Sequence, residues 1–154
     1  MPRAEPFPAD LRADLSGGTS GVARRLLPCS RMSHDRIVLG KTGEDLACRE
    51  LERRGYAIVA RRYRTRHGEI DVVARDGETT VFVEVKARTT GEFGTAAEAV
   101  TPFKQRRLVS MATDYLVRHR LMDRPCRFDV LTIENAAGEA GCKVVTLYRN
   151  AFDA

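Results

Sequence analysis

The chain has 154 residues, 43% of them hydrophobic and 31% charged, with a net charge of +5, which fits one globular domain with a tail. No stretch approaches the roughly 20 apolar residues of a membrane span. The first residues lack the apolar core of a signal peptide, and the four cysteines form no CxxC pair. These features argue against a membrane protein, a secreted protein and a zinc site, and leave the cytoplasm as the expected location.

Residues 1–34 differ from the rest of the chain, because prolines and glycines interrupt them and no apolar periodicity is sustained. We predict a disordered basic tail over 1–34, followed by a single domain over 35–154. Met32 is an alternative first residue, since structured sequence begins soon after it.

After this tail the pattern predicts a helix, three strands, a second helix and two strands, which is an α/β protein. The first helix covers residues 42–54, with Thr42 as its cap and Gly55 as its stop. The second begins at Thr101-Pro102 after a loop with some helix. Its apolar stripe consists of Leu108, Ala112, Tyr115 and Leu116. The strands are expected over residues 56–63, 69–74, 79–87, 128–133 and 143–148.

The third of these strands carries an acid and a lysine in an apolar setting. Side chains two apart share a face, so Glu84 and Lys86 stand side by side with Phe82. If Asp76-Gly77 forms a two-residue turn, Asp71 of the preceding strand lies opposite Phe82 and on that same face. A four-residue turn keeps this face, whereas a three-residue turn would separate the two acids.

Two carboxylates that converge on a dry sheet face repel each other, and Mg²⁺ or Mn²⁺ would relieve that repulsion. Asp71 and Glu84 are therefore candidate metal ligands, and Lys86 can hold an attacking water or neutralise charge that develops on phosphorus. Glu44 adds a third acid at the edge of the apolar stripe of the first helix. Ordinary surface ion pairs and a favourable helix dipole are the alternative explanations. Glu69 either assists the metal or pairs with Arg66 or Arg88.

Basic residues fall into three groups, which are Arg61, Arg62, Arg64 and Arg66; Lys86 and Arg88; and Lys104, Arg106 and Arg107. The last group lies in the first turns of a predicted helix, where free N–H groups and the dipole suit phosphate. A solvated basic face is the alternative there. Recognition of DNA by shape or backbone fits better than base reading, because no zinc finger or RNA-binding signature is present. The aromatic residues Tyr63, Phe82 and Phe93 are expected to pack rather than stack on bases.

The combined motifs resemble the YraN-like family of uncharacterised bacterial proteins over about residues 40–133. They are Gly40-x-x-Gly43-Glu44-x-x-Ala47, Gly68-Glu69-Ile70-Asp71, Phe82-Val83-Glu84-Val85-Lys86-x-Arg88, Phe93-Gly94 and Lys104. That family is similar to the archaeal Holliday-junction resolvases and other restriction-endonuclease-like nucleases. The resemblance implies a mixed, here five-stranded, sheet flanked by helices. It also implies Glu44, Asp71 and Glu84 as metal ligands, Lys86 as the catalytic lysine and Lys104 near the substrate. One departure is Arg62, at a position usually held by Asn.

These observations predict a metal-dependent endonuclease that hydrolyses DNA phosphodiester bonds, at branched or damaged structures, through a PD-(D/E)xK-type site. The expected catalytic residues are Asp71, Glu84, Lys86 and Glu44, with support from Glu69. The expected nucleic-acid contacts are Lys104, Arg88, Arg64 and Arg107. A binding module of the same fold that does not cut nucleic acid, and a scaffold for a protein partner, are the alternatives. Cutting two strands takes two centres, which leaves a homodimer as an option.

Overall fold

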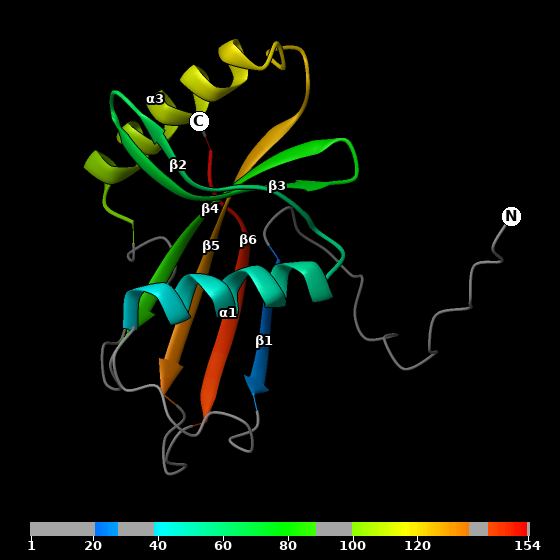
Figure 1. The fold of residues 1–154 in the computed structure, drawn as a ribbon, viewed down its shortest axis with the longest axis vertical. Helices are drawn as coiled ribbons and strands as arrows, with labels where there is room; N and C mark the ends of the chain where they lie inside the picture. The colour runs from blue at the N-terminus through cyan, green and yellow to red at the C-terminus, as the bar shows by residue number, and fades with distance from the viewer. Residues whose placement is uncertain (1–20, 28–38, 89–99, 136–141, 154) are drawn as a thin grey trace, which may run out of the picture.

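The computed structural model of the protein describes residues 21–27, 39–88, 100–135 and 142–153 (Figure 1). In chain order these residues form β1 (Val22–Leu27), α1 (Leu39–Arg53), β2 (Ala57–Thr65), β3 (Gly68–Asp76), β4 (Thr79–Arg88), α3 (Pro102–Arg118), β5 (Cys126–Asn135) and β6 (Lys143–Phe152). The loop predicted before α3, at residues 89–99, lies outside the described residues.

The described strands form one sheet in the order β1-β6-β5-β4-β3-β2. Neighbouring strands are antiparallel except for β4 and β5, which are parallel. A parallel pair needs a long crossover connection, and the chain segment that contains α3 provides it. The protein therefore has the predicted α/β fold with a mixed sheet, and after β1 the predicted order of elements is confirmed.

The strand β1 is an addition to the five predicted strands, and it lies inside the tail that was predicted to be disordered. All of its residues pair with residues 143–148 of β6. Its sequence shows no clear alternation, because two arginines interrupt the apolar residues. Pairing at the edge of a sheet depends on backbone groups rather than on an apolar face, so composition did not reveal this strand. The rest of the predicted tail lies outside the described residues.

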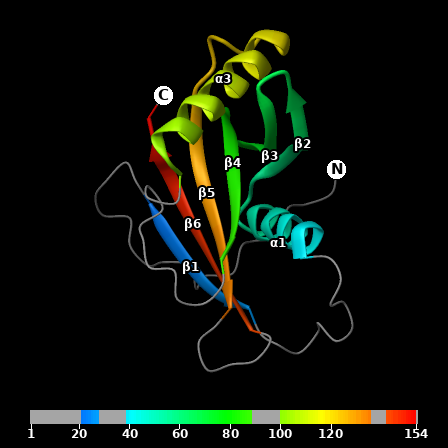
Figure 2. The ribbon, with the colours of Figure 1, turned by 90° about the vertical axis from the view of Figure 1, so that its left-hand side faces the viewer.

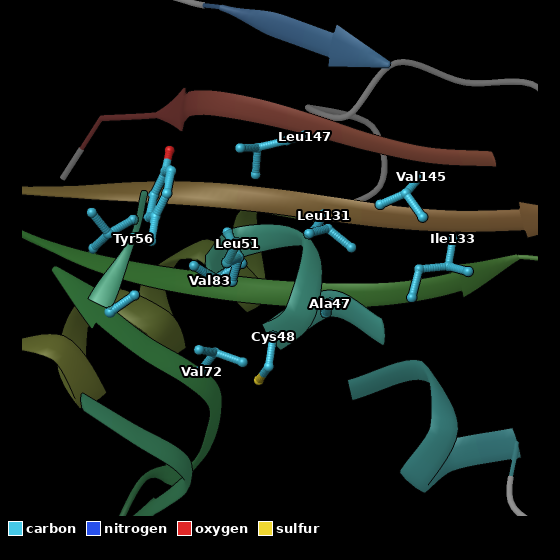
Figure 3. Close-up of a cluster of buried hydrophobic side chains, with 12 residues drawn as sticks. Ala47, Cys48, Leu51, Tyr56, Val72, Val83, Leu131, Ile133, Val145 and Leu147 are labelled. Carbon is cyan, nitrogen blue, oxygen red and sulfur yellow. The ribbon is translucent and has the colours of Figure 1, made fainter. Parts of the chain in front are cut away.

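The two helices cover opposite faces of the sheet, and Figures 1 and 2 show α1 and α3 on their different sides. Alternation along the strands divides the core. Val72 and Val83 pack in the cluster that includes Leu51 of α1, whereas Val73 and Phe82 pack in the cluster that includes residues of α3. Figure 3 shows the first cluster, in which side chains of α1 lie against those of the strands.

Helix α3 begins as the sequence predicted. Thr101 is its N-cap and accepts a hydrogen bond from the N–H of Lys104, and Pro102 occupies the first turn. The predicted stripe of Leu108, Ala112, Tyr115 and Leu116 is buried, together with Met111. Neither α3 nor the other described helix is long and apolar enough to cross a bilayer.

The hairpin between β3 and β4 turns one residue later than predicted. Asp76 pairs with Thr79, so Gly77 and Glu78 are the loop residues instead of Asp76 and Gly77. Gly77 has a φ of 59°, a value that glycine adopts without the steric cost of a side chain. In this register Asp71 lies opposite Glu84, in the pair that follows Val72–Val83, and not opposite Phe82. Both registers leave Asp71 and Glu84 on the same face of the sheet.

Two buried acids outside the candidate site are fully neutralised by arginine. Glu50 of α1 accepts hydrogen bonds from Arg53 and Arg54 at 2.7–3.0 Å and lies 3.4 Å from Arg25 of β1, which ties the edge strand to the helix. Burial acts to raise the pKa of Glu50, but the hydrogen bonds from these arginines lower it overall.

Asp129 of β5 is 1% exposed and forms the second such centre. Its carboxylate accepts hydrogen bonds from Arg127 at 3.1 Å, from the N–H of Asn150 at 3.0 Å and from the Tyr56 hydroxyl at 3.2 Å. Burial and then the charge of Asp129 raise the pKa of Tyr56 to about 12. The network links β5, β6 and Tyr56, the residue just before β2, by hydrogen-bonded polar groups.

Candidate functional site

Asp71 and Glu84 lie beside each other on the face of the sheet that α3 covers. Because Val72 pairs with Val83 and both point toward α1, the next pair in the register is Asp71 with Glu84, on the opposite face. A hydrogen bond of 2.8 Å from the N–H of Val85 to Oδ2 of Asp71 joins the two strands at this point. The structure therefore brings together the two acids that the sequence placed on one face.

Asp71 carries unrelieved negative charge. Burial, followed by the charge of Glu84, raises the pKa of Asp71 to about 6. The N–H of Val85 and the charge of Lys104 act to lower this pKa and do not offset the increase. Within the described part of the chain, no arginine or lysine forms an ion pair with Asp71. The carboxylate is thus placed where a cation would stabilise it.

Glu84 is 4% exposed and meets two lysines. Lys104 of α3 donates a hydrogen bond to its Oε1, and the Nζ of Lys86 lies 3.5 Å from the same oxygen. Burial acts to lower the pKa of Lys104, but the hydrogen bond and charge of Glu84 outweigh it and raise that pKa. Two ammonium groups therefore already lie against Glu84, the buried member of the carboxylate pair.

Glu44 is not part of this cluster. Its carboxylate accepts two hydrogen bonds, of 2.6 and 2.9 Å, from the guanidinium of Arg62 in β2. Its charge nevertheless contributes to the raised pKa of Asp71, as the smallest of the causes, so Glu44 lies at the margin of the site. The structure separates Glu44 from the acid pair by giving it an arginine partner.

Arg62 occupies an unusual backbone conformation with a φ of 50°. Asn is enriched several-fold among non-glycine residues in this left-handed region. This preference gives a physical reason for the Asn that the family resemblance places here. Arg62 accepts the same conformation, and its long side chain reaches Glu44, a contact that an Asn side chain is too short to make in the same way.

The remaining predicted site residues lie around the acid pair. Glu69 pairs with Arg64 at 2.9 Å, rather than with Arg66 or Arg88. Arg107 donates two hydrogen bonds, of 2.8 and 3.3 Å, to the backbone carbonyl of His67 in the turn between β2 and β3. The side chain of Arg88 lies outside the described part of the structure, as does Phe93. Tyr63 and Phe82 pack against Tyr115, as predicted.

Sequence patterns did not reveal two contacts of this site. The ion pair between Lys104 and Glu84 joins residues 20 apart that lie on different elements, so no local spacing encodes it. The ion pair between Glu44 and Arg62 likewise crosses from α1 to β2. The family motif pointed to Lys104 near the substrate, and the departure from Asn at Arg62 was the signal for the second contact.

The donor set fits a magnesium ion in part. Mg²⁺ is commonly held by one or two carboxylates and keeps several waters or phosphate oxygens, and Asp71 and Glu84 can provide those carboxylates. Among the described residues, no three His, Cys, Asp or Glu side chains are grouped closely enough to hold a metal ion. Glu44 would join the pair only by leaving Arg62.

Comparisons of the sequence with known proteins all point to one protein family. A model of an uncharacterised protein family, UPF0102, matches residues 43–133, more than half of the chain. A UPF0102 protein of Geobacter sulfurreducens is 50% identical over 107 residues, which cover 70% of this chain and 84% of the relative. A UPF0102 protein of Symbiobacterium thermophilum is 46% identical over 117 residues, which cover 75% and 97%. This match confirms the resemblance found in the motifs, and the chain belongs to the UPF0102 (YraN) family.

Proposed function

We propose that the protein is a metal-dependent endonuclease of the restriction-endonuclease-like class that hydrolyses phosphodiester bonds in DNA, at branched or damaged structures. The observation that carries this proposal is the pairing of Asp71 and Glu84 on one sheet face, next to Lys86 and Lys104. A dry carboxylate pair contributes nothing to binding a polyanion by itself, because like charges repel. Its chemistry is that of a cation site facing a phosphate.

Asp71 and Glu84 are the groups that would hold the ion, Mg²⁺ or Mn²⁺. When bound, such an ion polarises the phosphodiester and lowers the pKa of a coordinated water. Asp71 has the carboxylate whose charge is least neutralised, so it gains most from a cation. Glu84 is held in place by two lysines and is therefore oriented before any ligand arrives.

The two lysines have different positions, which suggests different roles. Lys86 follows Glu84 by two residues on the same strand face and lies 3.5 Å from it, so its ammonium can stabilise charge that develops on phosphorus. Lys104 comes from the first turn of α3, where the helix N-terminus also favours phosphate. If an ion held the Glu84 carboxylate, the ammonium of Lys104 would be free to contact a phosphate oxygen.

A cleavage assay tests the proposal. Labelled duplex, single-strand, flap and four-way-junction DNA are incubated with Mg²⁺ or Mn²⁺ and with the wild type, Asp71→Asn and Lys86→Ala. Glu78→Gln is the matched control, because Glu78 is an exposed acid of the β3–β4 turn that pairs with Arg124. Metal-dependent cutting that the first two substitutions abolish and the control preserves would support the proposal.

The alternative is a module of the same fold that binds nucleic acid without cutting it. The pairing of Glu44 with Arg62 favours this alternative, since it removes one predicted acid from the metal site. Binding of the DNA panel without cleavage in either metal would establish the alternative and overturn the nuclease proposal. A homodimer, one option for cutting two strands, is tested by light scattering of the same samples.

A further inference from the structure

A basic cleft runs between the outer side of α3 and the turn that joins β2 to β3, next to the acid pair. One hollow, of about 180 Å³, is lined by His67 of the turn and by Phe103, Arg106, Arg107 and Ser110 of α3. A second hollow, of about 380 Å³, adjoins the first, because His67 and Ser110 line both; Arg66 and Asp114 line it as well. The residues of α3 follow the spacing of one helix face.

The arginines of this cleft differ from most other arginines of the protein. Glu and Asp side chains pair with Arg53 and Arg54 at the end of α1, with the arginines of β2 and with those of β5 and β6. Arg66, Arg106 and Arg107, in contrast, meet no carboxylate among the described residues. Arg66 donates to the His67 ring at 3.0 Å, and Arg107 donates to the His67 carbonyl. Three arginines without a carboxylate partner therefore line the two hollows, and the one acid there, Asp114, is already paired with Arg118. This arrangement suits a polyanion.

Phe103 is the exposed aromatic residue of this cleft. It is 65% exposed, although it lies at the rim of the basic cleft in the first turn of α3. Other rings are packed: Tyr63 and Phe82 lie against Tyr115, and Phe82 and Phe152 lie against Phe128. An exposed ring beside unpaired arginines has the chemistry of a platform on which a nucleobase stacks between phosphate contacts.

The position of the cleft relative to the acid pair is also fixed. Phe103 directly precedes Lys104, whose ammonium contacts Glu84. On the other wall, His67 comes four residues before Asp71, a separation of roughly 13 Å along an extended strand. A strand that enters the cleft therefore reaches the carboxylates within a few nucleotides.

We propose that this cleft binds an unpaired nucleotide of the DNA substrate, with Phe103 stacked on its base and Arg106 and Arg107 at the flanking phosphates. A base can stack on the ring only when its face is free, so the cleft selects a single-stranded segment over an intact duplex. This inference rests on the proposed function, because it names the part of the substrate that the nuclease recognises.

Binding without metal tests the inference separately from cleavage. The full-length protein is titrated in EDTA against a fluorescein-labelled 15-nucleotide single strand and against the matching duplex, and anisotropy is recorded. Phe103→Ala is expected to weaken single-strand binding by roughly 5- to 100-fold and to affect the duplex much less. Phe103→Trp is expected to restore binding. Met122→Ala is the matched control, because Met122 is an exposed apolar residue beyond the end of α3 and lines neither hollow.

The charge contribution has its own readout. Arg106→Gln is expected to reduce the slope of log affinity against log salt by about one, for the single strand. The stacking site would be overturned if Phe103→Ala weakened binding of the single strand and the duplex equally, or if Phe103→Trp failed to restore single-strand binding. An interaction with acidic protein would show as unchanged DNA binding in Phe103→Ala together with Phe103-dependent binding of poly-glutamate, which also overturns it.

The outcomes separate the two proposals. Phe103-dependent binding of a single strand by a protein that never cuts would support this inference and overturn the nuclease. Metal-dependent cleavage, together with single-strand binding that Phe103→Ala leaves unchanged, would support the nuclease and overturn this inference. A wild-type protein that neither binds nor cuts DNA would overturn both proposals.

Discussion

Replacing Asp71 by Asn is expected to stabilise the metal-free protein above pH 7, although Asp71 is proposed to be essential for cleavage. The carboxylate lies in a half-buried place beside Glu84 and has only the N–H of Val85 as a hydrogen-bond donor among the described residues. An Asn side chain is isosteric and uncharged, and its carbonyl oxygen can accept that same hydrogen bond. The substitution therefore removes the repulsion and keeps the local geometry.

The size of the effect follows from the pKa. The pKa of Asp71 rises from 3.8 to about 6 on folding, and at about 1.4 kcal/mol per unit this corresponds to about 3 kcal/mol. Because the folded-state pKa is the higher one, the protonated acid favours the folded state. That contribution is complete below about pH 4 and is lost as the pH rises through 6. Asn does not ionise, so the variant avoids this loss.

Urea unfolding in EDTA between pH 4.5 and pH 8 measures the prediction. The difference between Asp71→Asn and the wild type should be small at the acid end and grow to about 3 kcal/mol above pH 7. Glu78→Gln, at the exposed turn, should change stability by less than about 0.5 kcal/mol throughout. A variant that is no more stable than the wild type at pH 8, or a gain that does not vary with pH, would refute the reasoning.

Three further substitutions follow from the same contacts. Glu84→Gln should destabilise the protein by about 1–2 kcal/mol at pH 8, because two lysines lose their anionic partner, and a gain in urea unfolding would contradict this. Gly68→Ala should reduce the free energy of unfolding by roughly 1–3 kcal/mol, because Gly68 has a φ of 139° and an added Cβ would lie 2.8 Å from the Arg107 guanidinium. An unchanged thermal melting curve would contradict this. Asp129→Asn should cost about 1–3 kcal/mol, because the donors around this buried carboxylate lose its charge while Arg127 keeps Asp76 at 2.7 Å. A smaller loss in calorimetry would contradict it.

The features that the sequence predicted correctly are those that local spacing determines. The alternation of β4 placed Glu84 and Lys86 on one face, and the cap at Thr101 placed the start of α3, because period and capping depend on residues a few positions apart. The hairpin shows the limit of this reasoning. Asp76-Gly77 and Gly77-Glu78 both supply a glycine for the turn, and the choice depends on how β3 pairs with β4 along its length.

Features that depend on contacts between distant elements were not predictable in the same way. The strand β1 is specified by pairing with β6 and by Arg25 at Glu50, more than 20 residues away, rather than by its own composition. The separation of Glu44 from the acid pair depends on Arg62, whose side chain crosses from β2 to α1. Spacing along one helix placed Glu44 at the edge of the apolar stripe but carried no information about that partner.

The acids in the interior of the described structure are matched by bases except at one place. Glu50 and Asp129, both buried, are surrounded by arginines, and Glu84 is matched by lysines. Among the described acids of the interior, Asp71 stands apart, because its charge meets a second carboxylate instead of a base. Three arginines without a carboxylate partner line the hollows a few residues away from it. A fold selected for stability alone would pair these charges with each other. Kept apart, they complement a cation and a phosphate backbone, which is the physical basis for the proposed nucleic-acid chemistry.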